Sequence, residues 1–296
     1  MDTDRQRYEL EATGAERGLY EDVRRTFRAP FVNWILRTLT ANAPVFTRYL
    51  WGQVKPLFET RAFARLTVEY RDAVLSKLEA DAPIPTFRRT DTDLSPAEYR
   101  ELREQVATFD VVAPRLAVLF EAVDRALCGD ALSPANAADD PDIEYDATAP
   151  YPAWLDRDRG AEPTMVDTVP ESLAETADGI RAFHGFDDTL PSIYRCLAQW
   201  PGYLDPAWDA LAPRFESSAF EAAVERSIDL VDLYVDDVPY QPRLTRADLR
   251  SAGFPERTVE GAASLFRTFN SGPVLTVLPA LPVWAATVGE AGERSL

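Results

Sequence analysis

Lysine is nearly missing from this sequence, which contains only Lys55 and Lys77. The 31 basic residues are otherwise arginines and face 49 acidic residues, so the formal net charge is -18. Such a composition suits a salt-rich cytoplasm, because carboxylates retain their water and their mutual repulsion is screened over about 3 Å at molar salt. We therefore expect a cytoplasmic protein of haloarchaeal type, the alternative being an ordinary acidic protein from a high-GC genome. The same charge repels phosphate backbones and predicts no binding to nucleic acid.

Cysteine and histidine are also scarce. The two cysteines, Cys128 and Cys196, are too few and too far apart for a metal knuckle or a disulfide scaffold, and we expect them to be buried small apolar residues. His184 is the only histidine, so no histidine cluster can hold a metal. We therefore expect neither a metal nor any other cofactor.

Long apolar runs are absent as well. No stretch of 18 apolar residues occurs, and the polar first 18 residues lack the core of a signal peptide. We therefore expect no membrane partner. The 46% of apolar residues, spread over 296 positions, is enough to form the core of a globular protein.

What the sequence does contain is an internal repeat. Residues 44–63 align with residues 201–220 without a gap, at a spacing of 157. Seven of the twenty positions are identical: Pro44/Pro201, Trp51/Trp208, Pro56/Pro213, Phe58/Phe215, Glu59/Glu216, Ala62/Ala219 and Phe63/Phe220. A repeat of this length corresponds to a folded unit, so we expect two such units to pack as halves with a pocket at their seam.

Helical periodicity dominates the remaining pattern. An apolar stripe follows residues 58–78 at helical spacing, and residues 216–235 repeat it. The segment 95–98 predicts the start of a helix, and a further helix is expected over about 111–128. The apolar segment 273–284 has the composition of a strand or of a helix interrupted by prolines, and its position favours the helix.

We therefore predict an all-α protein of two tandem pseudo-symmetric helical repeats, packed as an intrachain pseudo-dimer. The expected parts are a mobile acidic leader (1–16), a first repeat (17–130), a Pro/Asp-rich linker (131–171) and a second repeat (172–296). Formation of a homodimer is a further possibility that the sequence leaves open.

Separated positions in both halves carry a resemblance to a known family. They are the stretch Tyr20–Arg24, then Pro30, Val32, Arg37, Leu39, Pro44 and Trp51, and in the second half Pro191, Ser192, Leu197, Ala198, Trp200 and Pro201. In this order they resemble the group I 2-haloacid dehalogenases, the cofactor-free type that acts on both enantiomers. The resemblance implies an all-helical fold of two repeats with a pocket between them. It also implies that an Asp activates a water, which displaces halide from carbon 2 directly.

The residues implied for that chemistry are partly replaced here. The family's Ser-Asp pair falls on Ser192 and Ile193, and Ile193 cannot accept a proton. The family's Asn falls near Val123 of this chain, whereas Phe31 and Trp34 keep the aromatic character of the pocket. We therefore assign Phe31, Trp34, Ser192 and Ile193 to the expected substrate pocket.

Other polar residues are candidates for the missing chemistry. Asp187 and Asp188 precede position 193 at a helix entry, where one could serve as a substitute base or both could simply cap the helix. Asn270 lies where the second half mirrors the family's Asn segment, so it could bind the ligand or only end a helix. Arg37 and Arg195 occupy equivalent places in the repeats, and each could clamp a carboxylate or form a structural ion pair.

Two functions follow from these observations. The first is a hydrolase that removes halide from a small 2-haloacid, with Asp188 or Asp187 as its base. The second is a non-catalytic protein that binds another small carboxylic or apolar ligand, or a partner, on the same scaffold. A buried carboxylate facing the pocket would favour the hydrolase.

Overall fold

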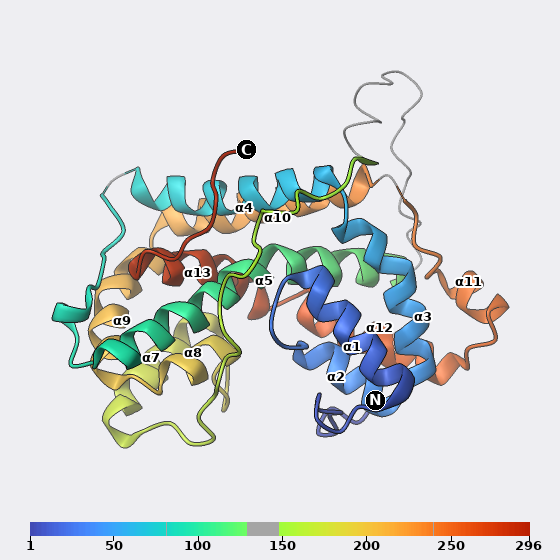
Figure 1. Cartoon of the computed structure of the whole chain (residues 1–296), viewed down its shortest axis with the longest axis horizontal. Coiled ribbons are helices and arrows are strands. Elements are labelled where there is room, and N and C mark those ends of the chain that lie inside the picture. The colour runs from blue at the N-terminus through green and yellow to red at the C-terminus, as the bar shows by residue number, and fades with distance from the viewer. Residues whose placement is uncertain (81, 129–147, 239) are drawn as a thin grey trace. The chain divides into compact units, whose positions relative to one another are not determined.

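The computed structural model describes residues 1–80, 82–128, 148–238 and 240–296, and Figure 1 shows their helical architecture. The only β-type pairing among these residues is an isolated bridge between Thr60 and Pro150. The predicted all-α class is therefore confirmed. Within the same residues, no helix combines the length and the apolar character needed to cross a bilayer.

Many of the helices follow one another with short connections, whereas longer segments precede α5 and α7. They are α1 (Gly14–Phe27), α2 (Trp34–Asn42), α3 (Pro44–Val54), α4 (Arg61–Glu79), α5 (Pro96–Cys128), α7 (Ala174–His184), α8 (Ser192–Leu197), α9 (Pro201–Phe215), α10 (Ser218–Asp236), α11 (Arg246–Ser251), α12 (Glu256–Phe269) and α13 (Val274–Thr287). Short 3-10 helices in the described ranges are η1 (Lys55–Phe58), η2 (Arg89–Asp91) and η3 (Glu171–Leu173).

Local sequence explains several helix starts. The backbone N–H of Ser95 donates to Glu98 Oε2 at 2.8 Å, and the Glu98 N–H donates to Ser95 Oγ at 3.3 Å. This reciprocal pair satisfies two amides that have no partner within α5, as the sequence predicted. Pro44 and Pro201 each occupy the first turn of a helix, where the missing N–H of proline costs nothing.

The chain is divided into two compact units. The first comprises Met1–Thr67, Pro114–Arg157 and Leu230–Ser271, and the second comprises Val68–Ala113, Asp158–Asp229 and Gly272–Leu296. The helices α4, α5 and α10 each contribute one end to each unit. Each unit therefore contains segments of both predicted repeats.

Aromatic side chains fill the core of the first unit, where α1 and α2 pack on α3 (Figure 1). The ring of Phe27 lies 5.5 Å from Trp51 and 5.0 Å from Phe58, measured between centroids. The Trp51 indole N–H donates to Asp22 Oδ2 at 2.8 Å, and the second oxygen of Asp22 accepts from Lys55 Nζ. The indole is thus buried without losing its hydrogen bond.

The second unit has a comparable core, in which α8 packs on α9 and α13 packs on α7. Tyr194, Tyr203 and Trp284 are fully buried, and the Trp284 ring lies 5.6 Å from Tyr194 and 6.2 Å from Tyr203. The hydroxyl groups of Tyr203 and Thr287 are 2.6 Å apart. The segment 273–284 therefore lies in a buried helix, as expected, although Pro279 and Pro282 lie inside it.

Several helix boundaries recur at the spacing of 157. The 19-residue helices α4 and α10 start at Arg61 and Ser218, and the 19 residues of each end at the same offset. Arg28 and Gly185 end α1 and α7 in the same left-handed conformation, with φ of 51° and 79°. These boundaries agree with the repeat, while superposition of the two halves stays a prediction.

Two features differ from the sequence-based description. The expected separate helices after residue 95 form one continuous helix of 33 residues, α5, with Pro114 inside it. Pro114 lacks the N–H that would bond to the carbonyl of Asp110, but the buried neighbours on both sides keep the helix continuous.

The leader 1–16 also does not stand apart, because the N–H of Val32 donates to Glu9 Oε1 at 2.7 Å and α1 already begins at Gly14. Of the predicted linker, residues 131–147 lie outside the described residues.

Gly160 provides a test of how the described part of this linker packs. Its φ is +90°, and a Cβ there would lie 2.8 Å from the backbone N of Thr108 and 2.9 Å from the carbonyl O of Glu104. We expect Gly160→Ala to lower the free energy of unfolding by about 2–4 kcal/mol, because backbone strain and overlap with α5 act together. Gly253→Ala is the matched control, since Gly253 has a φ of +84° with nothing within 4 Å of the added Cβ. Chemical denaturation should give a loss of only about 1 kcal/mol for that control, and equal losses would contradict the packing role of Gly160.

Candidate functional site

The helix α8 belongs to the second unit, and its first turn contains no acidic residue. Ile193 is only 1% exposed, whereas Ser192 is exposed at the first position of the helix. Asp187 and Asp188 are both exposed. Neither supplies the buried carboxylate that we expect of a substitute base, and a base at these two residues stays a prediction that the exposure of both side chains disfavours.

His184, the only histidine, is instead part of a buried relay of hydrogen bonds. Its Nδ1 lies 2.8 Å from the hydroxyl of Thr276, and its Nε2 lies 2.6 Å from the hydroxyl of Tyr194. Because the Thr276 hydroxyl donates to the carbonyl of Pro273, it accepts from His184 Nδ1–H. The Tyr194 hydroxyl therefore donates to His184 Nε2 while it accepts from the Trp284 indole at 3.3 Å.

This direction of hydrogen bonds requires a neutral imidazole. Burial lowers the pKa of His184 from 6.5 to about 3, and burial also raises the pKa of the Tyr194 phenol. The relay fixes α7, α8 and α13 to one another, and every donor and acceptor in it is used. These contacts give His184 a structural role in the second unit.

The predicted pocket residues of the first unit lie near the end of α12. Trp34 stacks on Phe269, with ring centroids 5.2 Å apart, and Phe31 is partly buried. Asn270 follows Phe269, and its Nδ2 donates to Glu121 Oε2 at 2.7 Å and to Asp124 Oδ2 at 3.3 Å. The amide N–H groups of Asn270 are thus directed to two carboxylates of α5.

The remaining candidates make structural contacts. The guanidinium of Arg195 donates twice to the carbonyl of Val166, at 3.1 and 2.9 Å. Arg37 lies over the ring of Tyr8, 4.9 Å from its centroid, and near Glu9. Cys196 is buried with its Sγ 3.0 Å from Gln105 Oε1, and burial raises the pKa of its thiol. Cys128, by contrast, is exposed, so the expectation that it is buried was wrong.

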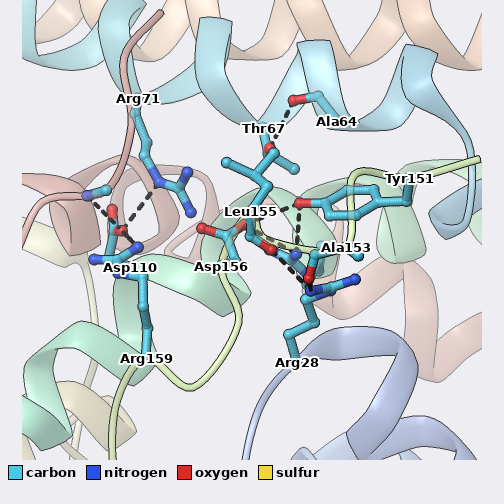
Figure 2. Close-up of polar contacts among 12 residues, drawn as sticks. Arg28, Ala64, Thr67, Arg71, Asp110, Tyr151, Ala153, Leu155, Asp156 and Arg159 are labelled. Atoms are coloured by element: carbon cyan, nitrogen blue, oxygen red, sulfur yellow. Dashed lines mark hydrogen bonds and ion pairs between the residues drawn. The ribbon is translucent and has the colours of Figure 1, made fainter. Parts of the chain in front are cut away.

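A buried ion-pair cluster, formed by Arg71, Asp110 and Arg159, lies in the second unit (Figure 2). Arg71 and Asp110 are both fully buried. Asp110 Oδ2 lies 3.0 Å from Arg71 Nε, 2.9 Å from Arg159 Nη1 and 3.1 Å from the backbone N of Gly292. Asp110 Oδ1 has no hydrogen-bond partner among the described residues.

A second ion-pair cluster lies in the first unit and contains the other fully buried arginine. Arg115 Nη2 donates to Asp156 Oδ2 at 3.0 Å, and the hydroxyl of Tyr151 donates to the same oxygen at 3.0 Å. Arg28 Nη1 donates to the carbonyls of Ala153 and Leu155 (Figure 2). These contacts hold the segment 151–156 against its unit.

The segment that delivers Asp156 and Arg159 has an unusual backbone. Asp156 and Asp158 both have a φ of 56°, and Gly160 has a φ of +90°. Asp is one of the few side chains that tolerate this left-handed region. Sequence reasoning assigned these residues to a linker and missed both clusters. The available signal was a charged residue within an apolar run, as at Asp110 in TFDVVAP and Arg115 in APRLAVLF.

Comparison with known proteins places these observations in context. The family model described as "Halocarboxylic acid dehydrogenase DehI" matches residues 30–157. The chain is 25% identical over 272 residues to the "(R)-2-haloacid dehalogenase" of Pseudomonas putida, covering 88% of this chain and 85% of that protein. It is 26% identical over 219 residues to a "2-haloacid dehalogenase, configuration-inverting" of Pseudomonas sp. (strain 113), covering 73% and 69%.

Solved structures extend the likeness to the fold. The chain in "The complex structure of D-2-haloacid dehalogenase with L-LA" matches with a TM-score of 0.77 and 22% identity, over 96% of this chain and 95% of that one. A second structure, described as "The crystal structure of D-2-halacid dehalogenase mutant", matches with a TM-score of 0.77 and 21% identity, over 96% and 94%. The fold is therefore the helical fold of these proteins. Together the likenesses support a relationship with the 2-haloacid dehalogenase family.

The neutral state of His184 has a measurable consequence. Its pKa of about 3 in the folded chain lies below the 6.5 of an exposed imidazole, so the unfolded chain binds the extra proton first as the pH falls. We expect the free energy of unfolding to be highest above pH 6.5 and to fall below it by up to about 1.4 kcal/mol per pH unit.

His184→Gln is expected to remove this slope between pH 6.5 and 5. Since the chain has a single histidine, its NMR titration can be followed without assignment ambiguity. A histidine signal that titrates near pH 6.5 in the folded protein would contradict the buried relay.

Proposed function

We propose that this chain is a dehalogenase-like hydrolase acting on small 2-haloacids. The observation that supports the proposal best is the likeness to 2-haloacid dehalogenases in sequence over 88% of the chain, together with the agreement in fold over 96%. Partial or local similarity would support the fold alone, whereas a relationship along nearly the entire chain favours retention of the substrate class.

The proposed reaction is direct displacement at carbon 2. A water forms the new C–O bond while the C–halogen bond breaks, the electron pair leaves with the halide, and a carboxylate accepts the proton of the water. The product is a 2-hydroxy acid of inverted configuration. The relatives include an "(R)-2-haloacid dehalogenase" and a "2-haloacid dehalogenase, configuration-inverting". We propose that, as in group I enzymes, both enantiomers are accepted.

A second function is favoured by position 193. The resemblance places the water-activating Asp there, and this chain has a buried Ile193 instead. On this alternative the chain binds a small carboxylic or apolar ligand without turning it over. Phe31, Trp34, Ser192 and Ile193 stay the residues predicted to contact the ligand under both functions.

The acidic composition suggests the conditions under which the protein works. A net charge of -18 favours folding in concentrated salt, and we propose a cytoplasmic protein of haloarchaeal type. Because the same charge repels phosphate backbones, we propose no nucleic-acid partner. Formation of a homodimer stays a separate proposal. Activity measurements therefore belong in molar KCl.

Turnover of each enantiomer tests the first function directly. Purified protein in molar KCl, given (R)- or (S)-2-bromopropionate, should release bromide at least about 100-fold faster than buffer and form one lactate per bromide. Bromide rather than chloride is measured because the buffer contains chloride. Bromide release at the buffer rate with both enantiomers would contradict the hydrolase. Calorimetric binding of 2-bromopropionate without release would then identify the second function.

Restoring a carboxylate at position 193 tests the inherited pocket. Ile193→Asp should raise bromide release by at least about 10-fold over wild type, because it returns a base to the place implied by the family resemblance. Ile193→Asn is the control, because the Asn side chain has nearly the shape of the Asp side chain but cannot accept the proton. Ile193→Asn should lose about 1–3 kcal/mol of stability by burying a polar group, and Ile193→Asp should lose more, because its carboxylate must be ionised to act as the base. Equal rates for the two variants would show that position 193 no longer faces the substrate.

A further inference from the structure

We infer that Asp110 is the catalytic carboxylate that takes the proton of the attacking water, in place of the acid missing at position 193. This inference rests on the proposed hydrolytic function. Among the described aspartates, Asp110 combines complete burial with a carboxylate oxygen that has no hydrogen-bond partner. The alternatives at the helix entry, Asp187 and Asp188, are exposed.

The two oxygens of Asp110 have different surroundings. Oδ2 faces three donors, from Arg71, Arg159 and the backbone N of Gly292, at 2.9 to 3.1 Å. Oδ1 has no partner among the described residues. A buried acceptor without a donor is costly, so Oδ1 marks a place where a donor such as water is favoured. The same oxygen is then within reach to accept the proton of that water.

The donors on Oδ2 also hold the carboxylate in one orientation. Arg71 is fully buried on α4, and Asp110 lies on α5, so both belong to regular helices of the second unit. A base that is held rigidly by helix residues is oriented before substrate arrives, which lowers the cost of reaching the reactive geometry. Figure 2 shows the Arg71 and Arg159 side chains converging on this one carboxylate.

Asp156 is the other buried aspartate in the part of the chain that the structure describes, and it provides a contrast. Its Oδ2 accepts from both Arg115 and the Tyr151 hydroxyl at 3.0 Å, and its oxygens are not among the buried acceptors without a partner. It forms a buried ion pair with an arginine as Asp110 does, yet it offers no comparable open oxygen. Asp156 is therefore the matched control for the stability effect of losing such a pair.

The C-terminal segment 290–294 covers Asp110, so the proposed step requires this segment to move. The Gly292 N–H covers Asp110, and the Glu290 carbonyl accepts from Arg159, whose side chain is 22% exposed. Arg294 anchors the segment through partly exposed pairs with Asp72 at 3.1 Å and Glu79 at 2.8 Å, and Glu290 forms an ion pair with Arg103. Partly exposed pairs of this kind are weak and are weakened further by salt, which favours the movement of the cover that the proposal requires.

In the proposed step a water hydrogen-bonded to Asp110 Oδ1 attacks carbon 2 of the bound haloacid. The C–O bond forms as the C–halogen bond breaks, the halide leaves with the bonding electron pair, and the proton passes to Oδ1. The proton is afterwards released to solvent, so the balance is one water consumed and one halide, one proton and one 2-hydroxy acid formed.

The decisive experiment compares Asp110→Asn with Asp156→Asn in molar KCl, with 2-bromopropionate as substrate. Asp110→Asn is expected to lower kcat for bromide release by about 100-fold or more while KM changes by less than about 3-fold, because the amide keeps the shape but cannot take the proton. Asp156→Asn is expected to retain kcat within about 3-fold. Thermal unfolding of both variants checks that each is folded at the assay temperature.

A third variant distinguishes loss of the base from loss of folding in Asp110→Asn. Asp110→Glu keeps the charge, and it is expected to shift the acid limb of the kcat–pH profile, which a purely structural residue would leave in place. If the wild type releases bromide and Asp110→Asn is equally active, the role of Asp110 is overturned while the hydrolase stands. An unmoved acid limb in Asp110→Glu would have the same meaning. Absence of bromide release from wild type would overturn the proposed hydrolase together with this role.

Discussion

Burial of guanidinium–carboxylate pairs is the constraint on which the rest of this structure depends. Arg71 with Asp110 in the second unit, and Arg115 with Asp156 in the first, are among the few charged groups in the core. A buried charge left alone is strongly destabilising, so each arginine must be met by its aspartate at the correct distance. This requirement explains why the segment around residues 156–160 adopts a left-handed backbone at three alternate positions instead of continuing as an irregular linker.

The choice of arginine fits the composition of the chain. A guanidinium is planar, carries several donors and is more weakly hydrated than an ammonium group, so it loses less on burial. The sequence has almost no lysine, and its acidic side chains lie mainly at the surface. Carboxylates at the surface are thus solvated by water and salt, whereas the few buried aspartates form ion pairs with arginine.

The helices could be predicted from sequence because their signals are local. The Ser95–Glu98 capping pair, the prolines at positions 44 and 201, and the apolar stripes all act within a few residues. The long helix α5 was missed because Pro114 is a local breaking signal that tertiary packing overrides. The family resemblance and the all-helical class followed from many positions at once.

The candidate site was less accessible to sequence reasoning. Proximity to position 193 drew attention to Asp187 and Asp188, which are exposed, whereas Asp110 was not considered. Its partners Arg159 and Gly292 are 49 and 182 residues away along the chain, and no local pattern links them. Asn270 was placed correctly at a helix end, but its carboxylate partners Glu121 and Asp124 also come from a distant helix. Long-range charge pairing is therefore the information that the sequence alone did not reveal.

The central claim is that a water, activated by a buried carboxylate, attacks carbon 2 directly. The most direct test is a single turnover in ¹⁸O-water with protein in excess over 2-bromopropionate, followed by mass spectrometry of the lactate. The account predicts one ¹⁸O atom in the new hydroxyl group from the first turnover, with inverted configuration. Lactate whose new hydroxyl carries ¹⁶O, transferred from a protein carboxylate, or the absence of lactate, would contradict it.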